Sequence, residues 1–146
     1  MKHLGFAAAL LGMCCAVPAQ AARFEANSPE AQTLMKAYFG NTLICKAEGI
    51  FECHNWMYPD GKFIQFSWDS RPNVMVDGVM LSGVNGLEGK WWLEGAAGKF
   101  QLCRQNAPTA KPMCQDEPQR KVGDQWDHPA HGNWPAEHFT LVEGRR

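Results

Sequence analysis

Three histidines late in the chain form its most concentrated set of metal-binding side chains. His128 and His131 flank Pro129, and His138 follows beside a glutamate. Imidazole and carboxylate groups are ligands that suit Zn²⁺ or Cu²⁺. Because of the proline, the first two histidines cannot share one regular helix face, as the H-E-x-x-H motif of zinc enzymes requires. We therefore keep His128, His131 and His138 as an alternative metal site and expect no bound cofactor.

Residues for covalent or acid–base catalysis do not assemble into a recognisable set. Ser67 and Ser82 lack the G-x-S-x-G context of a nucleophile elbow. Glu88 and Glu94 lie six positions apart, on the same strand face by parity and about 20 Å from each other at 3.3 Å per residue. That distance exceeds the spacing of glycosidase carboxylates. We name no catalytic residue and expect a non-catalytic protein.

Two adjacent tryptophans mark the most distinctive candidate for ligand binding. In a strand, Trp91 and Trp92 must point to opposite faces. Trp91 shares its face with Leu93 and is expected in the core, whereas Trp92 lies between Lys90 and Glu94 and is expected to be exposed. An exposed indole can stack on a sugar or on a partner's side chain. We predict Trp92, Lys90 and Glu94 as the ligand-binding residues; the alternative is that Trp92 packs under a helix or loop.

Four cysteines follow residue 21, an even number that is typical of a disulfide framework in an exported protein. Three pairings are possible. Cys45 and Cys53 are centred on Gly49, which would place them opposite each other in a hairpin with a three-residue turn. Cys103 and Cys114 flank a second candidate hairpin loop. These patterns favour the two local disulfides, Cys45 with Cys53 and Cys103 with Cys114.

The first 21 residues have the order of a secretory signal peptide. A lysine precedes the apolar run Leu4 to Val17, and Ala19-Gln20-Ala21 forms an A-x-A cleavage site. The run is shorter than the roughly 20 residues that span a bilayer. Lipid attachment at Cys14 or Cys15 is less favoured, because Met13 is bulky where such sites need a small residue. We expect a periplasmic or secreted protein with no integral membrane segment after cleavage.

The remaining chain has the size of a single domain with little net charge. The formal charge of the 146 residues is −1 at pH 7, and no basic stripe or polybasic patch occurs. This balance argues against nucleic acid as a partner. A chain of this length buries enough surface for a real core.

The expected elements are one helix followed by many short strands. Ser28 and Pro29 predict a helix start, and an apolar stripe predicts a helix over 29–39 within an N-terminal helical segment, 22–40. A β domain, 41–146, follows: a small antiparallel meander of about 7–8 strands, either barrel or sandwich. The expected strands are 42–47, 51–58, 62–68, 74–81, 89–94, 99–105, 112–115 and 138–143, with Trp68 in the core and a loop over 116–137.

Short motifs through the chain resemble a group of exported bacterial β-rich proteins of uncharacterised function. They are Gly40-Asn41-Thr42, Asp60-Gly61-Lys62-Phe63, Gly89-Lys90-Trp91, Leu102-Cys103 with Cys114, and Val122-Gly123-Asp124-Gln125-Trp126. The pattern implies a shared β fold and no catalytic residues. The stretch Ser82-Gly83-Val84-Asn85-Gly86, before an aromatic strand, also resembles periplasmic lysozyme-inhibitor barrels.

Three functions follow as hypotheses. The first is an exported non-catalytic binding or accessory protein whose partner is a small molecule, a glycan or a protein. The second is an inhibitor of a wall-degrading enzyme, which would present the loop 82–88. The third is a metal-dependent enzyme built on the three histidines.

Export and oxidation can be tested together. The mature protein should begin at Ala22 and contain no free thiol, because the A-x-A site precedes Ala22 and the four remaining cysteines can all pair. Intact mass should equal residues 22–146 minus four hydrogens. A mass that includes diacylglycerol, or alkylation without prior reduction, would contradict this.

Overall fold

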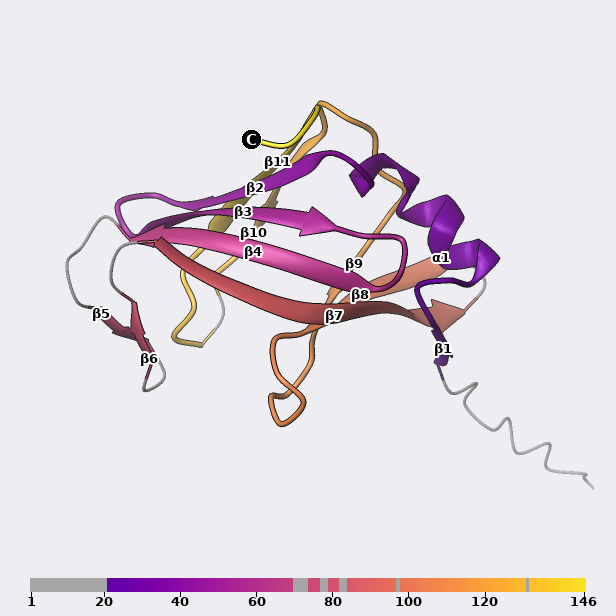
Figure 1. Cartoon of the computed structure of the whole chain (residues 1–146), viewed down its shortest axis with the longest axis horizontal. Helices are drawn as coiled ribbons and strands as arrows, with labels where there is room; N and C mark the ends of the chain where they lie inside the picture. The colour runs from indigo at the N-terminus through magenta and orange to yellow at the C-terminus, as the bar shows by residue number, and fades with distance from the viewer. Residues whose placement is uncertain (1–20, 70–73, 77–78, 82–83, 97, 131) are drawn as a thin grey trace, which may run out of the picture.

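The computed structural model describes residues 21–69, 74–76, 79–81, 84–96, 98–130 and 132–146 (Figure 1). The chain is mostly β, as expected, and has one short α-helix followed by a 3₁₀ turn. The elements are β1 Ala22–Phe24, α1 Pro29–Leu34, η1 Lys36–Tyr38, β2 Thr42–Ala47, β3 Phe51–Met57, β4 Lys62–Asp69, β5 Val74–Val76, β6 Val79–Leu81, β7 Val84–Ala96, β8 Lys99–Gln105, β9 Met113–Asp116, β10 Gln125–His128 and β11 Glu137–Val142. No helix among these residues is long and apolar enough to cross a membrane.

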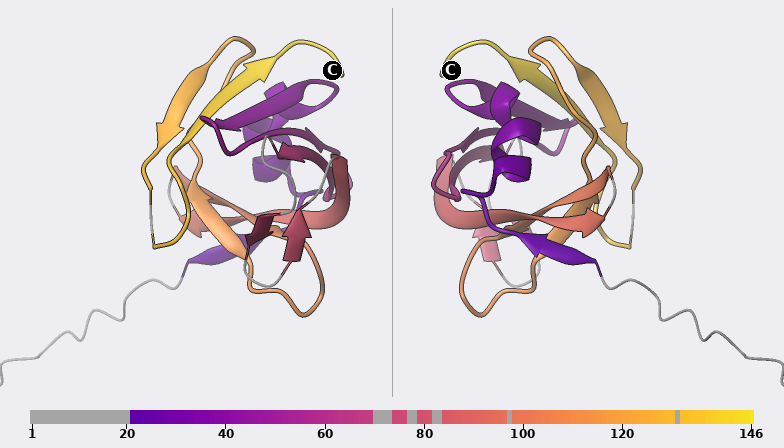
Figure 2. Two further views of the ribbon diagram at one scale, coloured as in Figure 1. Left: turned by 90° about the vertical axis from the view of Figure 1, so that its left-hand side faces the viewer. Right: turned by 90° about the vertical axis from the view of Figure 1, so that its right-hand side faces the viewer.

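One antiparallel sheet curls into a half-barrel. Its strand order is β10-β11-β2-β3-β4-β7-β8-β9, and β1 pairs with β7 beside this path. β9 and β10 are therefore the two end strands of this path, and β1 is paired on one side only. Figure 2 shows the curl end-on, with α1 at one mouth, and Figure 1 shows the small β5–β6 hairpin at the opposite end.

The helical segment is shorter than the predicted helix 29–39. Ser28 caps α1, since its Oγ accepts the Ala31 N–H at 3.2 Å, and Pro29 occupies the first turn. The α-helix ends before Met35, and a 3₁₀ turn continues to Tyr38. A 3₁₀ turn places side chains three positions apart on one face, so both Met35 and Tyr38 are buried against the sheet.

Both predicted disulfides are confirmed. Cys45 lies directly opposite Cys53 in the β2–β3 hairpin, and Cys103 lies opposite Cys114 in β8 and β9. Gly49 takes a left-handed φ of 70° within the three-residue turn, as the centred spacing implied. The two disulfides are consistent with a location outside the cytoplasm.

Two predicted elements are wrong. The expected loop 116–137 contains β10, which pairs with β11 and stacks the Trp126 ring on Phe139 at 5.5 Å. This strand has four residues and too little apolar character to stand out in sequence. The expected strand 74–81 is instead two short antiparallel strands, β5 and β6.

The interior of the half-barrel is filled by side chains from the sheet and the helical segment. Trp91, Phe63 and Phe139 are its largest apolar members from the sheet, and Tyr38 joins them from η1. The prediction that Trp68 lies in this core is wrong, because Trp68 is 38% exposed. Ile64, Phe66 and Trp68 do share a face by strand alternation, but the buried Phe63 shows that the opposite face of β4 points inward.

This assignment of faces predicts unequal losses of stability. Trp91→Ala should lower the free energy of unfolding by about 3–5 kcal/mol, as for a buried aromatic side chain. Trp68→Ala should cost less than about 1 kcal/mol because its side chain faces outward. Urea denaturation of the two variants measures both values, and equal losses would contradict the assigned faces of the sheet.

Candidate functional site

The predicted ligand residues lie on the outer face of β7, but Trp92 is not exposed. Only 4% of Trp92 is accessible, because the guanidinium of Arg23 lies 4.2 Å from its ring centroid. Its Nε1–H donates to Glu94 Oε1 at 2.8 Å. Arg23 belongs to β1, which pairs with Leu93–Gly95 of β7. The sequence prediction missed this cover because a three-residue strand has no readable alternation.

Lys90 and Trp92 lie on the floor of an open groove of about 930 Å³. One wall is formed by β1 with the linker that follows it, together with the β3–β4 turn. The other wall is the connection from β8 to β9. Figures 1 and 2 show β1 and this connection projecting on the same side of β7. The lining residues used below are Arg23, Glu25, Asn27, Asp60, Lys62, Glu88, Lys90, Trp92, Gln105 and Asn106.

The backbone at Gly89, one of the residues that line the groove, is closely packed. A Cβ at this position would lie 2.5 Å from the main-chain oxygen of Gln105 and 2.5 Å from the Phe63 ring. On the other side, the Trp91 N–H donates to the Gly61 oxygen at 2.8 Å, which ties the β3–β4 turn to β7. The side chain of Gln105 then holds the β8–β9 connection, because its Nε2 donates to the oxygens of Pro108 and Ala110 at 3.3 and 2.8 Å.

Charge in the groove is balanced. Its three basic side chains, from Arg23, Lys62 and Lys90, face three carboxylates. Two of these acids are already paired: Glu25 with Arg23 at 2.6 Å and Glu88 with Lys62 at 2.9 Å. Side-chain amides contribute further donors and acceptors. The groove therefore favours neither an anion nor a cation and offers many hydrogen-bonding groups.

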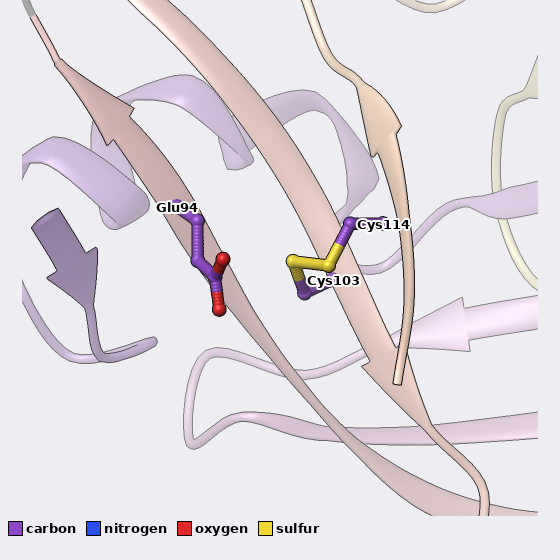
Figure 3. Close-up of side chains that lie close together, drawn as sticks. All are labelled: Glu94, Cys103 and Cys114. Carbon is purple, nitrogen blue, oxygen red and sulfur yellow. A yellow bond between two sulfur atoms is a disulfide. The ribbon is translucent and has the colours of Figure 1, made fainter. Parts of the chain in front are cut away.

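The third predicted ligand residue, Glu94, is not among the groove's lining residues. Its carboxylate lies beside Cys103 and Cys114, with the three potential ligand atoms within 4.8 Å of one another (Figure 3). The two sulfurs are bonded to each other. In the oxidised protein this group therefore has one carboxylate to offer and does not form a metal site.

The predicted histidine site is not brought together. His128 pairs in register with Glu137 and packs edge-on against the buried Phe139, on the inner face of the β10–β11 hairpin. His138 is on the outer face, where it contacts Asp127 Oδ1 at 2.7 Å. His131 is outside the described residues. The two described histidines thus point to opposite sides of one hairpin and cannot ligate the same ion.

A buried polar cluster escaped the sequence prediction. The Tyr38 hydroxyl donates to Glu117 Oε1 at 2.6 Å, and Arg104 and Glu137 are buried near them. Burial raises the pKa of Glu117, and burial together with the Glu117 charge raises the pKa of Tyr38. Burial lowers the pKa of Arg104, which its acidic neighbours oppose. Arg104 lies two positions after the buried Leu102 in β8, so strand alternation could have predicted that its side chain points into the half-barrel.

Arg120 closes this cluster from the connection between β9 and β10. Its Nε donates to Glu117 Oε1 at 3.3 Å, and its guanidinium lies 3.8 Å from the Trp126 ring centroid. Charged groups in an interior are stabilised when each is paired and hydrogen-bonded. These contacts hold the free edges of the half-barrel together, and we assign the cluster a structural role.

Comparisons with protein-family models, curated proteins and solved structures found no match to this chain. The resemblances noted in sequence stay predictions. In the structure, Val84–Glu88, part of the loop expected in an inhibitor, belongs to β7 and pairs with β4; residues 82–83 are outside the described part.

The buried cluster yields a prediction for Arg104. Arg104→Met should lower the free energy of unfolding by about 3–5 kcal/mol, because Glu117 and Glu137 lose their interior cation. Lys99→Met, on the same strand but exposed, should change it by less than about 0.5 kcal/mol. Chemical denaturation measures both.

The deficit of Arg104→Met should shrink in acid. The folded-state pKa of Glu117 is raised by burial. A carboxyl group whose pKa is higher in the folded than in the unfolded protein stabilises the fold at a pH below its unfolded pKa, about 4.3. This stabilisation is lost as the pH rises through the folded-state pKa. A deficit that stays constant between pH 4 and 7 would show that the carboxylates are not its source.

Proposed function

We propose that this chain is an exported, non-catalytic binding protein that holds a neutral, hydroxyl-rich ligand, an oligosaccharide, in the groove beside β7. One observation carries the proposal: Lys90 and Trp92, selected from sequence alone, lie on the floor of an open groove with balanced charge. The signal peptide predicted from sequence and the two disulfides support a periplasmic or secreted location.

We place the proposed site on the outer face of the sheet because side chains fill the interior of the half-barrel. In small barrels, a ligand pocket lies within the sheet when side chains leave room for it. Here Trp91, Phe139 and the helical residues Met35 and Tyr38 fill that space. Binding then depends on the outer surface, where the groove combines depth with polar groups.

The lining suits a sugar in two respects. Arg23 stacked on Trp92 presents a flat guanidinium surface backed by an indole, with the Arg23 side chain 53% exposed. Around it, the amides of Asn27 and Asn106 and the ammonium of Lys90 can bond to hydroxyl groups. A concave site with a small number of placed polar groups is the general arrangement of small-ligand sites.

The other two hypotheses have less support. An inhibitor was expected to present the loop 82–88, but most of that stretch is paired in the sheet. A metal-dependent enzyme would require His128 and His138 to converge, and they lie on opposite faces of a hairpin.

The proposal is tested by thermal unfolding with neutral oligosaccharides, including chitin oligomers and wall fragments. A ligand at a hundredfold excess over its Kd should stabilise the protein by about 2.7 kcal/mol. Lys90→Ala should weaken binding about tenfold, because a floor contact is lost. Lys99→Ala, at an exposed position outside the groove lining, should leave affinity unchanged.

Two results would overturn the proposal: no stabilisation by any neutral oligosaccharide, or equal affinity in Lys90→Ala and the parent protein. Inhibition of a lysozyme without oligosaccharide binding would favour the inhibitor instead.

A further inference from the structure

A second hollow lies on the outer face of the sheet, at the opposite end of β4 from the groove. It measures about 380 Å³ and is lined by Trp68 and by residues 46–52, which form the end of the β2–β3 hairpin. Lys46, Glu52 and Trp68 are neighbours on adjacent strands, because Glu52 lies opposite Lys46 in β2 and opposite Trp68 in β4. This site is called the hairpin hollow below.

Trp68 gives the hairpin hollow an exposed aromatic surface. It is 38% exposed, and the His54 ring packs edge-on against its indole at 4.7 Å. His54 is itself fixed, because its Nε2 lies 3.0 Å from Glu52 Oε1. An exposed indole that is supported from the neighbouring strand is a surface on which a sugar ring can stack.

The charges of the hairpin hollow disfavour an acidic ligand. Lys46 is paired with Glu52 at 3.1 Å, and Glu48 adds a second carboxylate to the lining. Hydrogen bonds from His54 and Lys46 lower the pKa of Glu52, so this group is ionised at neutral pH. One cation thus faces two carboxylates in the hairpin hollow, while the charges of the groove are balanced. A polyanion would be repelled at one of the two sites.

The outer face of β4 connects the two sites. Lys62 lines the groove, Trp68 lines the hairpin hollow, and six positions separate them on the same face of the strand. At 3.3 Å per residue, their Cα atoms are about 20 Å apart. In Figure 1, β4 runs from the turn near β1 to the end of the sheet that carries β5 and β6.

The surface between the two sites is apolar. Ile64 and Phe66 lie there on the outer face of β4, both half-buried. Gly86 is directly opposite Phe66 in β7, and a Cβ at this glycine would come within 3.2 Å of the Phe66 ring. The glycine therefore lets the ring lie close to the sheet. No charged residue occurs in the sequence of β4 between Lys62 and Trp68.

We propose that the ligand of this protein is a linear, uncharged polysaccharide that occupies the groove and the hairpin hollow together and stacks one sugar ring on Trp68. This inference rests on the proposed function, since it requires the groove to bind sugar. A chain held in the groove brings its later units near the hairpin hollow, so the second contact forms at a high effective concentration. A long chain should therefore bind more tightly than a short one, although both make the same contacts in the groove.

The test compares the trisaccharide and the hexasaccharide of chitin by isothermal titration calorimetry. The trisaccharide is too short to reach from one site to the other, and the hexasaccharide is long enough. The parent protein should bind the hexasaccharide at least tenfold more tightly, a gain larger than the few-fold statistical advantage of a longer chain. Trp68→Ala should remove this gain and leave the affinity for the trisaccharide unchanged.

Three further variants serve as controls. Trp68→Phe should keep part of the gain, because a phenyl ring can still stack on a sugar. Val122→Ala changes another exposed apolar residue, outside both linings, and should keep all of the gain. Lys90→Ala should weaken the binding of both oligomers, since both occupy the groove.

The outcomes separate this inference from the proposed function. If the trisaccharide binds but the hexasaccharide binds less than about threefold more tightly, or if Trp68→Ala keeps the gain, the inference is overturned and the groove remains the binding site. If neither oligomer binds the parent protein, the inference is also overturned. The proposed function then falls as well only if no other neutral oligosaccharide stabilises the protein.

Discussion

The hydrogen bond between the Tyr38 hydroxyl and the Glu117 carboxylate joins the helical segment to the connection that follows β9. A curled antiparallel sheet that stops before closure leaves two free edges and an unprotected interior. In this chain β9 and β10 end the main strand path, and η1 and the connection after β9 contribute the buried Tyr38 and Glu117 to the interior. Tyr38, Glu117 and Arg120 link these two segments, so the filled core, and hence an outer location for any ligand, depends on them.

Local chemistry made much of the fold predictable. Cys45 and Cys53 have the same parity and are centred on a glycine, which permits one hairpin register, and the structure has that register. Ser28 and Pro29 similarly predicted where the helix begins. Trp68 shows the limit: alternation groups Ile64, Phe66 and Trp68 correctly, but which face is buried depends on what packs against the sheet. The burial of Phe63 in the structure shows which face of β4 points inward, and the sequence of β4 alone does not.

Only the floor of the candidate groove could be predicted from the sequence. Lys90 and Trp92 fall on one face by alternation, but the groove exists because Arg23, Asp60 and Asn106 arrive from three distant parts of the chain. The burial of Trp92 could not be predicted either, because it depends on β1, a strand of only three residues. The contact of Arg145 with the rings of Trp56 and Tyr58 was also unpredictable, because the arginine is about 90 positions away in sequence.

β1 begins at Ala22, the residue that also follows the predicted cleavage site. A peptidase must hold the bond between Ala21 and Ala22 in extended form, and Ala22 and Arg23 cannot at the same time pair with Gly95 and Glu94. If the chain is cleaved at this predicted site, the peptidase must act while β1 is undocked. Until β1 docks, Trp92 lacks its cover and the groove lacks a wall. The shortest strand of the sheet therefore completes both the packing of Trp92 and the shape of the groove.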